Sequence, residues 1–184
     1  MLIVFAQFAV LGQSIEGFSL PNTVNGTTFS LSTFKADKAI VFFFYSGKCA
    51  YVDHYFERIT SIIDEFSAKG VKFVLINSNS STYVAEESVD EMNKFAERNN
   101  LNIPYLADKD KLVKNMLKAT RTPEVFVLKP DQNQFLVIYK GAIDDNPQSA
   151  SDVSHAYLQD ALFNLLNNNI IELKQTRPVG CLIK

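Results

Sequence analysis

An uninterrupted apolar run, Ala39–Tyr45, constrains the fold of this chain more than any other feature of its sequence. The run shows no alternation of apolar and polar residues, which is typical of a central strand buried on both faces. Between Ala50 and Phe66, apolar residues recur at three- and four-residue steps, which predicts an amphipathic helix that ends at Gly70. Because a second apolar run, Val71–Ile76, follows, we expect a right-handed strand–helix–strand unit with parallel strands.

The segments on either side of this unit predict a mixed α/β fold. Gly17–Leu31 has the pattern of an N-terminal β-hairpin, since Asn25-Gly26 supplies the positive φ of a tight turn. The later strands are separated by a short, turn-rich connection, which predicts a second, antiparallel hairpin. We therefore expect a mixed sheet flanked by helices on both faces. The remaining predicted elements are helices at 88–99, 110–118 and 154–166, the last capped near Ser151 or Asp152, and strands at 125–128 and 135–139.

Composition excludes several classes of function. The chain has 184 residues, which suits one domain, and its net charge of −2 supplies no basic surface for nucleic acid. It contains neither of the common glycine-rich phosphate loops, and its two Cys and two His do not have the spacing of metal ligands. We expect no metal, no cofactor and no membrane partner. The expected organisation is a domain at 15–170, preceded by an apolar lead at 1–14 and followed by a C-terminal extended tail at 171–184.

The first residues of the chain have two interpretations that the sequence leaves open. Residues 1–12 form an apolar run of the length found in secretory signals, but no Lys or Arg precedes it. The alternative is an ordered N-terminal strand or a loosely packed lead. A signal would imply export, to the periplasm, where disulfides persist. Its absence would imply the cytoplasm, where thiols stay reduced.

Cys49 is the first candidate for chemistry. It lies where the buried strand gives way to the predicted helix, and the positive end of a helix dipole and unpaired backbone N–H groups both favour the thiolate. Lys48 adds a neighbouring cation, and the carboxyl ends of parallel strands are where sites form in such sheets. The alternative is a buried, inert cysteine. Thr122-Pro123, just before a predicted strand, marks a tight and sometimes cis turn.

Six segments of the chain form a recognisable set when they are taken together in their order: Phe18–Pro21, Cys49–His54, Ile76–Asn79, Thr122-Pro123, Gly141–Asp145 and Arg177–Lys184. They resemble the thioredoxin-like superfamily, and most closely its peroxiredoxin-like redoxin branch, which is related to alkyl hydroperoxide reductase and thiol-specific antioxidant domains. The resemblance extends from about Leu11 to Lys184. It implies a thioredoxin-like fold and a redox-active Cys49, with Thr122 and Pro123 presenting backbone groups to an extended substrate.

Departures from the superfamily's motifs define the chemical question. Val52 occupies the place of the second cysteine of a thioredoxin Cys-x-x-Cys motif, so a disulfide formed at Cys49 must be resolved by another thiol. In peroxiredoxins the peroxide-reacting cysteine falls at this same place, while Ser46 stands where their motif has Thr. Cys181, in the tail, is the second candidate: it can pair with Cys49, pair with another chain, or be inert.

Three functions follow as hypotheses. The first is a thiol–disulfide oxidoreductase with Cys49 as nucleophile and Cys181 or an external thiol as the resolving group. The second is a thiol-dependent peroxidase, and the third a non-catalytic binding domain. Lys48, Ser46 and His54 are supporting candidates, although a helix rotates His54 by roughly 140° from Cys49. The expected partner is a protein or small-molecule thiol or disulfide, with a peroxide as the alternative.

Overall fold

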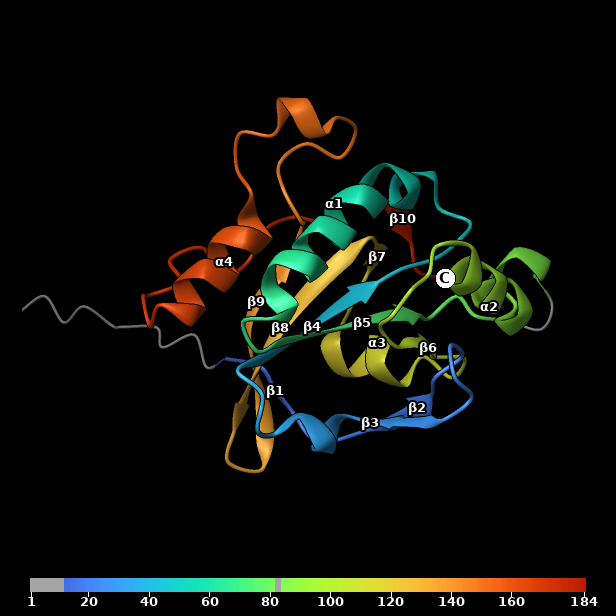
Figure 1. Ribbon diagram of the computed structural model, residues 1–184, viewed down its shortest axis with the longest axis horizontal. Helices are drawn as coiled ribbons and strands as arrows, with labels where there is room; N and C mark the ends of the chain where they lie inside the picture. Colours follow the sequence, from blue (N-terminus) through green and yellow to red (C-terminus); the bar gives the residue numbers. More distant parts are fainter. Residues whose placement is uncertain (1–11, 82–83) are drawn as a thin grey trace, which may run out of the picture.

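The structure is a computed structural model that describes residues 12–81 and 84–184. Within these residues a six-stranded mixed sheet has the order β1-β9-β8-β4-β5-β6, with β4, β5 and β6 parallel and the other neighbours antiparallel (Figure 1). Its strands are β1 (Ser14–Ile15), β4 (Ala39–Phe44), β5 (Val71–Asn77), β6 (Tyr105–Ala107), β8 (Glu124–Asp131) and β9 (Gln134–Gly141).

Four α-helices and two small strand pairs complete the described part of the chain. The helices are α1 (Ala50–Ser67), α2 (Val89–Arg98), α3 (Leu112–Leu117) and α4 (Tyr157–Leu166), with 3₁₀ turns η1 (Leu31–Phe34), η2 (Ala85–Glu87) and η3 (Ala150–Asp152). The small pairs are β2 (Ser19–Pro21) with β3 (Thr28–Ser30), and β7 (Arg121–Thr122) with β10 (Cys181–Leu182).

The central strand β4 is buried on both faces, as its apolar run predicts. Val41 and Phe43 join one core with residues of α1, α2 and α4. Phe42 and Phe44 point to the opposite face and join a second core with the β2–β3 hairpin and α3. Figure 1 shows the same layering, with α1 and α4 on one side of the sheet and α3 with the hairpin on the other. The expected α/β fold with helices on both faces is confirmed.

One local expectation, the start of the last helix, is wrong, and another concerns residues that the structure does not describe. The last α-helix begins at Tyr157 rather than near Ser154, and its N-cap is Ala156 rather than Ser151 or Asp152. Residues 150–152 form the separate turn η3. The Asp145 carboxylate accepts a hydrogen bond from the Ser154 backbone N–H (2.9 Å), which holds this part of the chain outside α4. Residues 1–11 of the expected apolar lead lie outside the described residues.

No helix among the described residues is both long and apolar enough to cross a membrane.

Candidate active site

Cys49 is the N-cap residue of α1, with an extended backbone (φ −95°, ψ 114°). The chain leaves β4, forms a turn in which the Cys49 N–H donates to the Ser46 carbonyl (3.1 Å), and enters the helix. The Cys49 side chain makes no capping hydrogen bond to the first turn, and the residue is only 2% exposed. A thiolate released at this position would face the positive end of the α1 dipole, as the sequence predicts.

The tail brings Cys181 to Cys49, and the two residues form a disulfide with a Cα–Cα distance of 5.9 Å. The thiols are separated by 132 positions in the sequence. Of the three fates left open for Cys181, the structure therefore has the direct pair with Cys49. Val52 stands where a Cys-x-x-Cys motif has its second cysteine, and Cys49 pairs instead with a cysteine near the C-terminal end of the sequence.

Strand pairing, hydrogen bonds and a buried side chain hold the tail in addition to the disulfide. Strand β10 pairs antiparallel with β7, with Cys181 opposite Thr122, and the Arg121 guanidinium donates to the Gly180 carbonyl (2.8 Å). The Ile183 N–H donates to the Thr120 carbonyl (3.0 Å), and the Ile183 side chain is buried in the second core. These contacts do not involve the sulfur atoms, so we expect them to hold Cys181 near Cys49 in the reduced protein as well.

Thr122 and Pro123 form the loop against which both cysteines lie. The Thr122–Pro123 peptide bond is cis, and the Thr122 carbonyl oxygen lies 3.1 Å from Cys49 Sγ. Thr122 Oγ1 accepts the Ser46 backbone N–H (3.0 Å) and donates to the Phe44 carbonyl (3.1 Å). This buried hydroxyl therefore ties the loop to the strand end that carries Cys49.

Ser46 has a different role from the one its position suggests. Its hydroxyl donates a very short hydrogen bond to the Glu87 carboxylate, whose other oxygen accepts Asn77 Nδ2 (2.8 Å). Glu87 is only 4% exposed, and sequence reasoning missed it because an acidic residue in a polar stretch looks like an ordinary surface position.

Lys48 is exposed and pairs with Glu86 (3.7 Å), so part of its charge is already compensated.

His54 is exposed on α1 and lies outside the pocket that the two cysteines line. Val52 is fully buried in the core beneath α1. Burial also raises the pKa of Tyr45 and Tyr105 well above the usual range of a phenol, so both stay protonated next to the site. The structure thus brings together Ser46, Lys48, Cys49, Thr122, Pro123 and Cys181, and leaves His54 aside.

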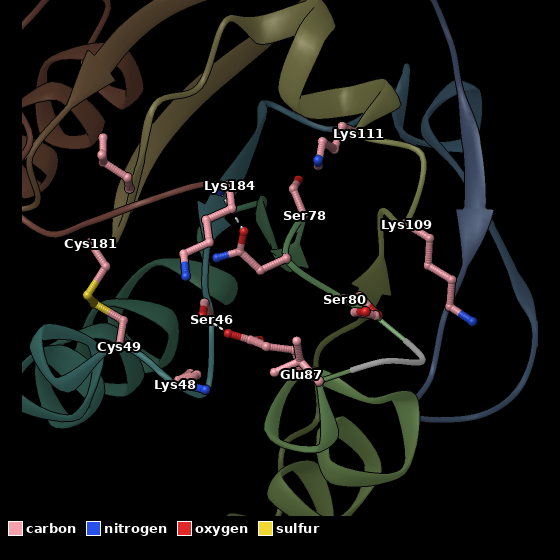
Figure 2. A pocket seen from close by; sticks show the side chains of 14 residues that line it. Ser46, Lys48, Cys49, Ser78, Ser80, Glu87, Lys109, Lys111, Cys181 and Lys184 are labelled. Atoms are coloured by element: carbon pink, nitrogen blue, oxygen red, sulfur yellow. Dashed lines mark hydrogen bonds between the residues drawn. A yellow bond between two sulfur atoms is a disulfide. The ribbon is translucent and has the colours of Figure 1, made fainter.

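A cavity of about 660 Å³ opens next to the disulfide (Figure 2). Figure 2 shows the disulfide at one side of this cavity and Lys109 and Lys111 toward the other. Lysines and hydroxyl-bearing residues dominate the lining, which the sequence could not assemble because it comes from distant segments. The lining residues include Ser46, Lys48, Ser78, Asn79, Ser80, Ser81, Glu87, Lys109, Lys111, Leu182 and Lys184. Among the described residues, no group of three or more His, Cys, Asp or Glu side chains could hold a metal ion.

Comparison with known proteins places this site in a family. Residues 11–143 match the model of the AhpC/TSA family. The chain belongs to the AhpC/TSA family. A search of curated proteins found no match. AhpC/TSA membership agrees with the redoxin resemblance of the sequence, and the mixed sheet with its cis-Pro loop is the thioredoxin-like fold.

Solved structures that share this thioredoxin-like fold include proteins named as a peroxidoxin and as a disulfide oxidoreductase. An uncharacterized conserved protein from Geobacillus kaustophilus is 31% identical, with 94% of this chain and 90% of that one covered and a TM-score of 0.85. The peroxidoxin BcpB of Mycobacterium tuberculosis is 23% identical (84% and 94% covered, TM-score 0.59). A secreted disulfide oxidoreductase of Mycobacterium tuberculosis is 16% identical (79% and 94% covered, TM-score 0.56). At these low identities, the two Mycobacterium tuberculosis structures show that the fold is shared and no more.

Proposed function

We propose that the protein is a thiol–disulfide oxidoreductase in which Cys49 is the nucleophile and Cys181 the resolving thiol. The observation that carries the proposal is the Cys49–Cys181 disulfide, which lies at the N-terminus of α1 and against the cis-Pro loop. A helix N-terminus favours a thiolate, and the thiolate is the form that attacks a disulfide. The substrate class is therefore a protein or small-molecule disulfide.

The proposed reaction consists of two thiol–disulfide exchanges. The Cys49 thiolate attacks one sulfur of the substrate disulfide, forms a mixed disulfide, and releases the other substrate sulfur as a thiolate. Cys181, as a thiolate, then attacks Cys49 Sγ, and the mixed disulfide breaks toward the substrate. The substrate leaves as two thiols, and the protein carries the Cys49–Cys181 disulfide. An external thiol reductant completes the cycle.

The tail contacts support Cys181 as the resolving group. Because β10 pairs with β7 and Ile183 is buried, Cys181 stays within reach of Cys49 and needs no second chain. Effective concentrations in such preorganised pairs are high, which speeds the second step.

A peroxidase is the competing function, because the AhpC/TSA family and the peroxidoxin fold both suggest it. Two observations favour disulfide exchange instead. The place that holds the peroxide-reacting cysteine in the peroxiredoxin motif is here Val52, which is fully buried. Ser46, which stands at the place of the motif's Thr, donates its hydroxyl to Glu87.

The pH dependence of Cys49 alkylation in the reduced protein tests the nucleophile. We expect the rate to rise with a midpoint below the roughly 8.5 of an ordinary thiol. The Cys181→Ser variant isolates Cys49, Lys48→Gln should move the midpoint slightly upward, and His54→Asn should leave it unchanged. A midpoint at or above 8.5 would reject Cys49 as an activated nucleophile.

Stopped-flow measurement of hydrogen peroxide consumption tests the peroxidase. We expect a rate no faster than that of a free thiol at the same pH. A much faster rate, lost in the Cys49→Ser variant, would make peroxide the substrate.

The third hypothesis, a non-catalytic binding domain, is tested in cells. If the Cys49→Ser variant preserves every cellular phenotype, the protein is a non-catalytic binding domain.

A further inference from the structure

The chain's own tail covers the edge of the cis-Pro loop at which an extended substrate could pair. Strand β10 runs antiparallel to β7, with Cys181 opposite Thr122 and Leu182 opposite Arg121 (Figure 1). The backbone at Gly180 lies so close to the loop that a Cβ there would overlap the Thr122 carbonyl. No second strand fits between the tail and β7, so a polypeptide would have to displace β10 before it could pair with this edge.

The backbone donors beside this pairing are engaged by a buried carboxylate. Glu124 accepts hydrogen bonds from the backbone N–H groups of Thr120 (2.7 Å) and Arg121 (3.0 Å). Pro123, which follows β7, has no N–H to donate. An extended segment binds a strand through the strand's unpaired N–H and C=O groups, so the loop offers it little to pair with while the tail is docked.

Contacts that follow Cys181 in the tail oppose its displacement. The Ile183 N–H donates to the Thr120 carbonyl (3.0 Å), and the Ile183 side chain is buried in the second core. The Lys184 N–H donates to Asn79 Oδ1 (2.8 Å). None of these contacts involves a sulfur atom, so we expect the tail to stay docked in the reduced protein, which is the form that attacks a substrate.

The cavity beside the disulfide is the approach that the docked tail leaves open. Cys49 and Cys181 both line it, and Figure 2 shows their sulfurs at one side of it. Leu182, which is 62% exposed, adds apolar surface to the lining next to Cys181. The volume of about 660 Å³ is in the range of small-molecule sites. A small disulfide can therefore reach Cys49 without any movement of β10.

We infer that the substrate is a low-molecular-weight disulfide, and that the docked tail excludes disulfides held in extended protein segments. The inference rests on the proposed function and narrows its substrate class. The Cys49 thiolate attacks one sulfur of the small disulfide and bonds to it, and the other half leaves as a thiolate that takes up a proton. The Cys181 thiolate then attacks Cys49 Sγ and releases the second half. The substrate is reduced to two thiols, and the two cysteines are oxidised to their disulfide.

The test compares two neutral disulfides that have the same chemistry at sulfur. One is cystine blocked with acetyl and methylamide groups, and the other is the disulfide dimer of a blocked, uncharged seven-residue peptide with cysteine at its centre. The reduced Cys181→Ser variant is used, because Cys49 is then the sole thiol. Formation of the mixed disulfide is followed by alkylation-quenched mass spectrometry. Each rate is divided by the rate of the same disulfide with blocked cysteine as a reference thiol, which corrects for intrinsic reactivity.

The corrected rate for the peptide should be at least about tenfold below that for blocked cystine, because the peptide must first draw the buried Ile183 side chain out of the core. Adding Ile183→Asp should release the tail and raise the peptide-to-cystine ratio by about tenfold. Val179→Asp adds the same charge to the tail at an exposed position and should leave the ratio low. Hydrogen exchange of the amide at position 183 reports release, and Gly180→Ala is a second variant that should displace β10.

Two results would overturn the exclusion of extended segments. The first is a ratio near one while the tail is docked, with Cys49 faster than the reference thiol toward both disulfides. The second is a ratio that stays low in a variant whose tail is released, since something other than the tail would then exclude the peptide. The proposed function fails on a different result, namely a Cys49 that reacts with both disulfides no faster than the reference thiol.

Discussion

Removing the cross-link between the tail and α1 should cost this protein a large share of its stability. In the loop-entropy description, a disulfide that joins residues 132 positions apart lowers the entropy of the unfolded chain enough to stabilise the fold by about 5 kcal/mol. We expect the native contacts of the tail to stay in place in the reduced form, because β10–β7 pairing and burial of Ile183 do not involve the sulfur atoms. The loss therefore arises in the unfolded state.

Thermal unfolding followed by far-UV circular dichroism measures this loss in the oxidised and reduced proteins. For a chain of this size, 1 kcal/mol corresponds to about 2–4 °C, so reduction should lower the midpoint by roughly 10–20 °C. The Cys181→Ser variant should unfold like the reduced protein and should not respond to reductant. Oxidised and reduced midpoints within a few degrees of each other would refute the reasoning, because they would mean that the disulfide does not cross-link the native fold.

Three further substitutions test contacts around the site and the core. A Cβ at position 180 would overlap the Thr122 carbonyl, so Gly180→Ala should displace β10. The intramolecular disulfide should then form more slowly, as followed by timed alkylation. An unchanged rate would contradict the docked tail. Thr122→Val leaves the Ser46 N–H without its acceptor and should lower the unfolding free energy in urea by about 1–3 kcal/mol, whereas a neutral outcome would show that the loop is not held by this hydroxyl. Asp144→Ala removes the carboxylate that pairs with the half-buried Arg58 guanidinium (2.6 Å) and should cost about 1.5–3 kcal/mol in the same assay. A loss below about 1 kcal/mol would show that this ion pair contributes little to the fold.

Much of the fold follows from local patterns in the sequence. The apolar run Ala39–Tyr45 predicts a strand buried on both faces, and the structure places Ala39–Phe44 there. The periodicity that follows predicts a helix from Ala50, which begins where expected because Cys49 takes the N-cap. Both features depend on residues close together in the chain, so hydrophobic pattern is enough to find them.

The site was predictable only in part, because its remaining components are set by long-range packing. The position of Cys49 and the turn at Thr122-Pro123 can be located from the sequence, but the return of Cys181 depends on β10–β7 pairing between segments far apart in the chain. Glu87 and Lys109 have no local pattern that marks them, and they acquire a place in the site only when η2 and the loop before α3 meet at the carboxyl end of the sheet. The sequence does not locate the start of α4 at Tyr157, because the polar stretch near Ser151 offers several N-cap residues with no preference among them.

The central claim, that Cys49 attacks and Cys181 resolves, is tested most directly by mixing the reduced protein with an excess of oxidised glutathione and analysing the quenched products by mass spectrometry. The wild-type protein should accumulate the Cys49–Cys181 disulfide and release both halves of the reagent as thiols. The Cys181→Ser variant should instead stop at a glutathione adduct on Cys49, formed much faster than any adduct on Cys181 in the Cys49→Ser variant. Adducts that form equally slowly in the two variants, with no intramolecular disulfide in the wild type, would contradict the account.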